Sequence, residues 1–155
     1  MLCGFACMSA KSKFNQSHYE TLAEFRYALR KFLHFSETAA QAVGVTPQQH
    51  QAMLAIKGFP GRDQVTVGEL AERLQIKHHS AVGLADRLVA ENFLRRVTDQ
   101  QDRRQVYLAL TPAGEAILEK LSATHREQLR RIGPQINRLL ESLQGMEPVP
   151  GSGAE

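Results

Sequence analysis

The spacing of hydrophobic residues predicts a long amphipathic helix near the start of the chain. Ser17 and Glu20 form the S-x-x-E pattern of a capping box, and Gly44 ends the periodic pattern. The apolar face between these points consists of Leu22, Phe25, Leu29, Phe32, Leu33, Ala40 and Val43. A stripe of this length predicts a helix that buries one face against other helices.

Two further capping boxes predict the next two helices. Thr46 and Gln49 open a helix with proline at its first position, and this helix ends near Gly58. Residues 59–64, "FPGRDQ", read as a turn. Thr66 and Glu69 then open a short helix whose apolar positions share one face.

A break at residues 75–77 separates this short helix from another that runs to about Asn92. Its apolar stripe follows the i, i+3, i+4, i+7 pattern: Ala81, Leu84, Ala85 and Leu88. Two short helices joined by a tight turn predict a helix-turn-helix.

Residues 93–98 and 105–111 are rich in β-branched and aromatic residues, with a polar segment between them, and predict a β-hairpin directly after the helix pair. Thr111 and Pro112 begin a long C-terminal helix, which Gly133 and Pro134 are expected to break before a last helix. The predicted fold is mainly α with a small β-hairpin.

The face of the second short helix opposite its apolar stripe is small and polar. It carries His79, Gly83, Asp86 and Ala90, flanked by Ser80, Val82 and Arg87. A helix of this kind suits the major groove of DNA, where side chains reach base edges and a glycine permits close approach. An ordinary solvated helix is also polar on its outer face, so this pattern alone leaves both interpretations open.

The hairpin favours DNA binding, because its loop carries Arg103 and Arg104. Seven Lys/Arg and four Asp/Glu lie between Arg73 and Arg104, a local excess of 7 − 4 = +3 that equals the net charge of the whole chain. An arginine on a projecting loop can enter a narrow minor groove, where the negative potential is strongest.

These segments resemble the MarR (multiple antibiotic resistance) family of bacterial transcriptional regulators. The similar stretches are "VTVGELAERL" and the segment from "HHSAVGLADRL" to "DRRQVYLALTPAG", which carries a D-x-R…LT-x-x-G pattern. The resemblance implies a winged helix-turn-helix in which Arg104 enters the minor groove and Asp102 orients it. The implied DNA-binding residues are Lys77, His78, His79, Ser80, Gly83, Arg87, Asp102, Arg103 and Arg104.

The residue patterns and this resemblance together predict a domain organisation, and the resemblance implies a mode of regulation. Residues 1–16 form an arm, 17–44 and 112–144 the dimerisation helices, 46–111 the DNA-binding lobe, and 145–155 a disordered tail. The protein is then a homodimeric repressor, released from a pseudo-palindromic operator by a small ligand, phenolic in some relatives. Candidate walls of the ligand cleft are Phe25, Phe32, His34 and Phe35, which can equally be dimer core.

Two alternatives stay open. Cys3 and Cys7 could form a redox switch, or they could belong to an unstructured arm, and Met8 is another candidate start. The winged helix could also bind only protein. Adjacent His78 and His79 point about 100° apart on a helix, so DNA contact suits them better than one metal ion.

Composition excludes other classes. Hydrophobic residues make up 43% of the chain and charged residues 23%, and no apolar run reaches the roughly 20 residues of a membrane span. The first residues lack the basic region of a secretory signal, so a cytoplasmic protein is expected. No hydrolase, metalloprotease or phosphate-loop motif occurs, so we expect neither an enzyme nor a cofactor. A metal site would require folding to gather the scattered His18, His34, His50 and His125.

Overall fold

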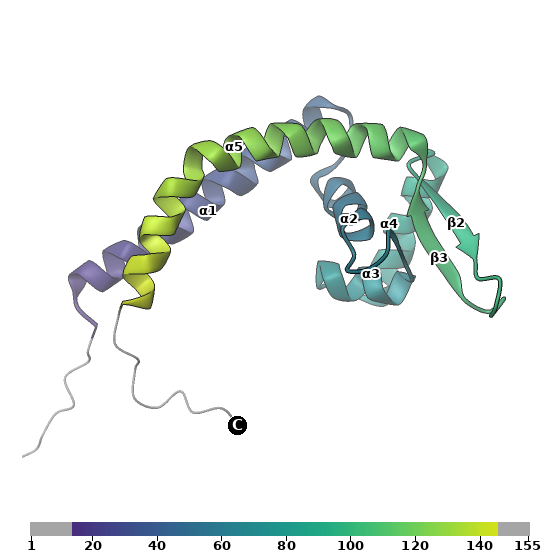
Figure 1. The fold of residues 1–155 in the computed structure, drawn as a ribbon, viewed down its shortest axis with the longest axis horizontal. Helices are drawn as coiled ribbons and strands as arrows, with labels where there is room; N and C mark the ends of the chain where they lie inside the picture. Colours follow the sequence, from purple (N-terminus) through teal and green to yellow (C-terminus); the bar gives the residue numbers. More distant parts are fainter. Residues whose placement is uncertain (1–13, 146–155) are drawn as a thin grey trace, which may run out of the picture. The chain divides into compact units, whose positions relative to one another are not determined.

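The computed structural model of the chain describes residues 14–145, which form five helices and three short strands (Figure 1). These residues divide into two compact units, one made of residues 14–31 and 130–145 and the other of residues 32–129. Cys3, Cys7 and the predicted tail beyond Gly145 lie outside the described residues. Within residues 14–145, no helix is long and apolar enough to cross a membrane.

Helix α1 (Gln16–Ala42) begins at a different cap from the predicted one. The Asn15 side-chain oxygen accepts the backbone N–H of His18 at 3.1 Å, and His18 Nδ1 accepts the backbone N–H of Asn15 at 3.2 Å. Each of these two side chains thus accepts the backbone N–H of the other residue, as in a capping box. The prediction that Ser17 caps this helix is wrong, because asparagine is at least as good a cap and stands two residues earlier.

Helix α5 (Pro112–Gln144) is continuous and contains Pro134, so the predicted break at Gly133 and Pro134 is wrong. Proline removes one backbone N–H, and its ring clashes with the carbonyl four residues earlier and with the backbone N–H and Cβ of the preceding residue. Gly133 has no Cβ, which removes one of these clashes. The start of α5 at Pro112 is as predicted.

The second unit contains the main hydrophobic core and the predicted helix-turn-helix. Helices α2 (Pro47–Lys57) and α3 (Val67–Leu74) both begin with the predicted capping boxes, at Thr46 and Thr66. Helix α4 (His78–Ala90) follows after a left-handed residue at Gln75. The largest fully buried side chains are Met53, Ile56, Val65, Leu70, Leu84, Leu88, Leu94, Leu108 and Leu121.

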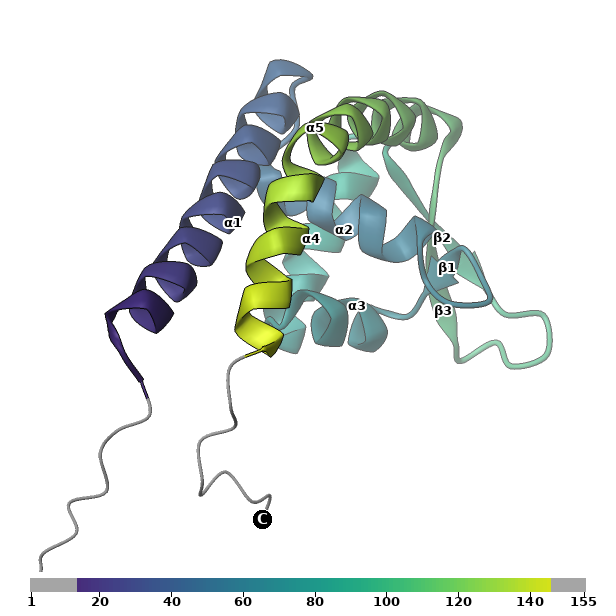
Figure 2. The ribbon, with the colours of Figure 1, turned by 60° about the vertical axis from the view of Figure 1, so that its left-hand side comes forward.

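A small antiparallel sheet completes this unit, with strand order β1-β3-β2 (Figure 2). Strands β2 (Leu94–Thr98) and β3 (Val106–Leu110) form the predicted hairpin, called the wing below (residues 94–110). Strand β1 (Gln64–Val65) pairs Val65 with Leu108, although Gln64 was assigned to a turn. Two residues are too few to show a periodic pattern, so this strand had no sequence signal.

Candidate nucleic-acid interface

Helix α4 presents the predicted polar face to solvent. Ala81, Leu84, Ala85 and Leu88 are buried, which confirms the predicted apolar stripe. The exposed residues at its start and along its outer face are Lys77, His78, His79, Ser80, Val82, Asp86 and Arg87. Lys77 is the N-cap and its side chain makes no capping hydrogen bond, whereas the Ser80 backbone N–H donates to the Lys77 carbonyl at 3.0 Å.

Gly83 lies in the middle of this face, beneath the side chain of Arg87. A Cβ added at Gly83 would lie 3.7 Å from Arg87 Nη1, an ordinary van der Waals contact. The helix itself therefore does not require glycine at this position. A requirement for glycine, if there is one, must come from something that approaches the helix from outside.

Hydrogen bonds from two aspartates shape the loop of the wing. Asp99 Oδ1 accepts the backbone N–H groups of Gln101 and Asp102, at 2.7 and 3.3 Å. Asp102 Oδ1 accepts the backbone N–H of Arg104 at 3.0 Å. Asp102 thus fixes the main chain at Arg104, whereas the side chains of Arg103 and Arg104 are exposed at the end of the wing.

In the helix-turn-helix and wing, acidic side chains have partners within the protein more often than basic side chains do. The four acidic residues between Arg73 and Arg104 all have internal partners: Asp86 pairs with Arg96, Glu91 accepts from Gln49, and Asp99 and Asp102 hold the wing loop. Six of the seven basic side chains from Arg73 to Arg104 form no ion pair with another described residue: Arg73, Lys77, Arg87, Arg95, Arg103 and Arg104. All six are exposed, so this surface presents unpaired positive charge to solvent.

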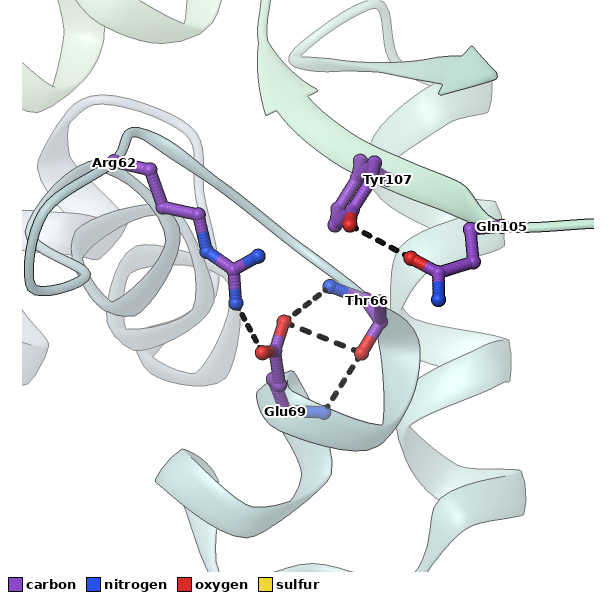
Figure 3. A network of polar contacts seen from close by, with 5 residues as sticks. All are labelled: Arg62, Thr66, Glu69, Gln105 and Tyr107. Atoms are coloured by element: carbon purple, nitrogen blue, oxygen red, sulfur yellow. Dashed lines mark hydrogen bonds and ion pairs between the residues drawn. The ribbon is translucent and has the colours of Figure 1, made fainter. Parts of the chain in front are cut away.

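A cluster around Arg62 joins the loop after α2 to α3 and to the wing (Figure 3), and no sequence pattern indicated it. The Arg62 guanidinium pairs with Glu69 and lies over the rings of Phe59 and Tyr107. Partial burial tends to raise the pKa of Glu69, but the Thr66 backbone N–H and the Arg62 charge together lower it. Glu69 is therefore an ionised anchor for Arg62.

The start of α5 explains the LT-x-x-G pattern physically. Thr111 Oγ1 donates to the Asn92 carbonyl at 2.6 Å and accepts the Gly114 backbone N–H at 3.1 Å. A Cβ at Gly114 would lie 2.2 Å from the Phe93 carbonyl oxygen, closer than any side chain can approach. Threonine caps the helix, and glycine lets α5 pass directly over the chain between α4 and β2.

Two of the four scattered histidines come together where α1, α2 and α5 meet. The rings of His50 and His125 are 4.8 Å apart, and the rings of Phe32 and Phe35 lie edge-on to His125. Burial and the neighbouring His125 lower the pKa of His50. Within the described residues, no group of three or more His, Cys, Asp or Glu is placed to hold a metal ion.

The predicted ligand residues are only partly brought together. Phe32 and Phe35 share the aromatic cluster at His125, His34 is exposed, and Phe25 is half-buried in the other unit. A cavity of about 300 Å³ lies between α2 and α5, but its lining is Lys57, Glu115, Leu118, Glu119 and Ser122. The cleft drawn from the four predicted residues is therefore a prediction still.

The sequence of the helix-turn-helix and wing is similar to that of known transcriptional regulators. A sequence model of the MarR family matches residues 43–105, which include α2, α3, α4 and most of the wing. The HTH-type transcriptional repressor MdtR of Bacillus subtilis is 32% identical over 88 residues, which are 57% of this chain and 55% of MdtR. Over residues 43–105, this chain is therefore similar to the MarR family.

A second regulator is similar in sequence, and a solved structure is similar in fold. The transcriptional activatory protein BadR of Rhodopseudomonas palustris is 29% identical over 97 residues, 62% of this chain and 55% of BadR. A MepR variant of Staphylococcus aureus bound to an oligodeoxyribonucleotide has a TM-score of 0.61 at 19% identity, covering 84% of this chain and 99% of MepR. The chain spans about half the length of the curated relatives MdtR and BadR. Both are named as transcriptional regulators and not as enzymes, in agreement with the sequence-based expectation.

Proposed function

We propose that this chain is a DNA-binding transcriptional repressor of the MarR family that recognises a pseudo-palindromic operator as a homodimer. The observation that carries the proposal is the pairing of an exposed polar α4 with a wing whose end carries Arg103 and Arg104. Helix α4 enters the major groove, where His79 and Ser80 reach base edges, and Arg104 contacts the adjacent minor groove. The unpaired cations of this surface attract the phosphate backbone.

Dimerisation is supported by apolar side chains that the single chain leaves in solvent. Tyr19, Tyr27, Leu29 and Leu33 of α1 and Leu129 and Leu140 of α5 are all exposed. Burying such residues across a two-fold axis removes apolar surface from water. A symmetric dimer then places its two α4 helices on half-sites about one helical turn, roughly 34 to 36 Å, apart.

Selection from a random DNA pool tests the DNA-binding function. We expect the protein to enrich an inverted repeat whose half-sites are about one turn apart. If no duplex is retained at low salt, the DNA-binding function is contradicted and the alternative of a winged helix that binds only protein is favoured.

Light scattering tests the dimer. The wild-type protein should have twice the mass of one chain, and Leu33→Glu should shift it toward one chain. Leu54→Glu is the matched control, because it places the same charge on an exposed leucine of α2. A wild-type mass of one chain would contradict the proposal.

Release of DNA by a small aromatic molecule completes the proposed function. Phe32 and Phe35 bring aromatic surface from α1 to the point where α2 and α5 meet, so a ligand there would bear on all three helices. The alternative, a thiol switch, needs Cys3 and Cys7. If peroxide releases DNA from the wild type but not from the Cys3→Ser/Cys7→Ser variant, the redox mechanism replaces the ligand mechanism.

A further inference from the structure

A side chain from outside the wing and the helix-turn-helix contacts both of them, in addition to the Arg96–Asp86 ion pair and the pairing of β3 with β1. Arg62 lies in the loop between α2 and β1, and its guanidinium carbon is 4.7 Å from the Phe59 ring centroid and 5.5 Å from the Tyr107 ring centroid. The same guanidinium forms an ion pair with Glu69 in the first turn of α3. One planar cation thus contacts its own loop, helix α3 and strand β3 (Figure 3).

The carboxylate that anchors Arg62 is itself held in place. Glu69 Oε2 accepts the backbone N–H of Thr66 at 2.8 Å and faces the Thr66 hydroxyl at 3.3 Å, so it belongs to the capping box of α3. The side chains of Arg62 and Glu69 are 34% and 30% exposed, which limits screening of their charges by solvent. Glu69 therefore holds the Arg62 guanidinium at the start of α3, and α3 packs against α4.

The other end of this contact leads to the loop of the wing. Tyr107 donates its hydroxyl hydrogen to Gln105 Oε1 at 2.8 Å. The Gln105 backbone N–H donates to the Asp102 carbonyl at 2.9 Å, and Asp102 Oδ1 accepts the Arg104 N–H. An unbroken series of contacts thus runs from the cap of α3 to Arg104.

We propose that Arg62 is a positioning residue for DNA recognition, which sets the angle of the wing so that Arg104 and α4 engage one half-site together. This inference rests on the proposed function in that the wing and α4 are taken to contact the same DNA. A hairpin fixed only by its strand pairing can twist about its base. The Arg62 contacts with Glu69 and Tyr107 restrict that motion.

Hydrogen exchange without DNA tests the structural half of the proposal. In Arg62→Met, the wing amides of Asp99 and Gln105, both hydrogen-bonded in the loop, should exchange about tenfold faster or more, while α4 is unchanged. Arg73→Met is the matched control, because Arg73 also stacks on Phe59, at 4.9 Å, and carries the same charge. Unchanged exchange in the wing of Arg62→Met, or equal acceleration in Arg73→Met, would overturn the proposal.

A double-mutant cycle on DNA tests the functional half. The probe is a duplex that the wild-type protein selects from a random pool, and affinities are compared in the wild-type and Arg104→Ala backgrounds. Arg62→Met should weaken binding about five- to tenfold in the wild type and less than about twofold when Arg104 is absent. Arg62→Lys keeps the charge without the planar guanidinium, so its affinity for the duplex should lie between those of the wild type and Arg62→Met.

Other results of the cycle separate the two claims. Equal losses in both backgrounds would mean that Arg62 acts independently of the wing, and the positioning role would be wrong. If Arg104→Ala itself does not weaken binding, the proposed function fails at the wing, whatever hydrogen exchange shows for Arg62.

Discussion

Arg96 of strand β2 forms an ion pair with Asp86 on the outer face of α4. A cation of the wing therefore neutralises the only carboxylate on the α4 face proposed to enter DNA. The two side chains are 44% and 57% exposed, so the pair contributes less than about 1 kcal/mol to stability. Its main consequence is electrostatic, because it limits repulsion between α4 and phosphates.

Asp86→Asn should consequently bind DNA about two- to fivefold more tightly, with a free energy of unfolding within about 1 kcal/mol of the wild type. Asp63→Asn is a suitable control, since it removes one charge from an ion pair with Lys57 outside α4 and the wing. Fluorescence anisotropy over a salt series measures the effect. Weaker binding by Asp86→Asn would instead indicate that this carboxylate reads a base.

Gly83→Ala should change stability and DNA affinity in opposite directions. The added methyl group fits beside Arg87, and alanine favours a helix interior over glycine, so unfolding should cost about 0.5–1 kcal/mol more. If the backbone at Gly83 approaches DNA closely, the same methyl weakens binding. Urea denaturation and DNA titration of one preparation measure both, and unchanged affinity would place Gly83 away from the DNA.

Gly114→Ala should destabilise the protein by at least about 2 kcal/mol, because the new Cβ would meet the Phe93 carbonyl oxygen at 2.2 Å. The clash is with a backbone carbonyl and the Cβ is fixed to the backbone of Gly114, so no side-chain rotation relieves it and α5 has to move. Urea denaturation is the measurement, with Gly83→Ala as the control substitution. A normal midpoint for Gly114→Ala would show that α5 does not pass so close to Phe93.

Stability should fall as pH falls below about 6.5, because His50 is kept neutral in the fold. Burial and His125 lower the folded pKa of His50 below its ordinary value of 6.5, so the unfolded chain binds more protons around pH 6. The stabilisation is complete above the unfolded pKa and is lost as pH drops through the folded one. His50→Gln should flatten urea midpoints between about pH 7.5 and pH 5, whereas exposed His34→Gln should not.

Local signals predicted most of the fold. The capping boxes at Thr46 and Thr66 and the stripe from Ala81 to Leu88 depend on residues within one or two turns, and the structure has them as predicted. The failures involve competition between local options. Asn15 caps α1 in place of Ser17, and α5 continues through Pro134, which follows Gly133. Each outcome is set by small steric and hydrogen-bond differences between neighbouring residues.

The exposed residues of the candidate interface could be predicted from the sequence, but the contacts that hold them in place could not. Polar positions on α4 and arginines in the wing loop follow from periodicity and charge. The contacts of Arg62 with Tyr107, and of His50 with His125, join residues far apart in sequence that no short-range pattern relates. Such pairs arise from the way the helices and the sheet pack, which the sequence encodes only through the whole core.

The most direct test of DNA recognition by α4 and the wing compares Arg104→Ala with His79→Ala on a panel of duplexes selected by the wild type. Arg104→Ala should weaken binding to all of them and lower the slope of log affinity against log salt by about 1 for each copy of the chain. His79→Ala should leave that slope nearly unchanged and alter the order of preference among the duplexes. Equal effects of both variants on every duplex, or no effect of either, would contradict the assignment of α4 and the wing to DNA.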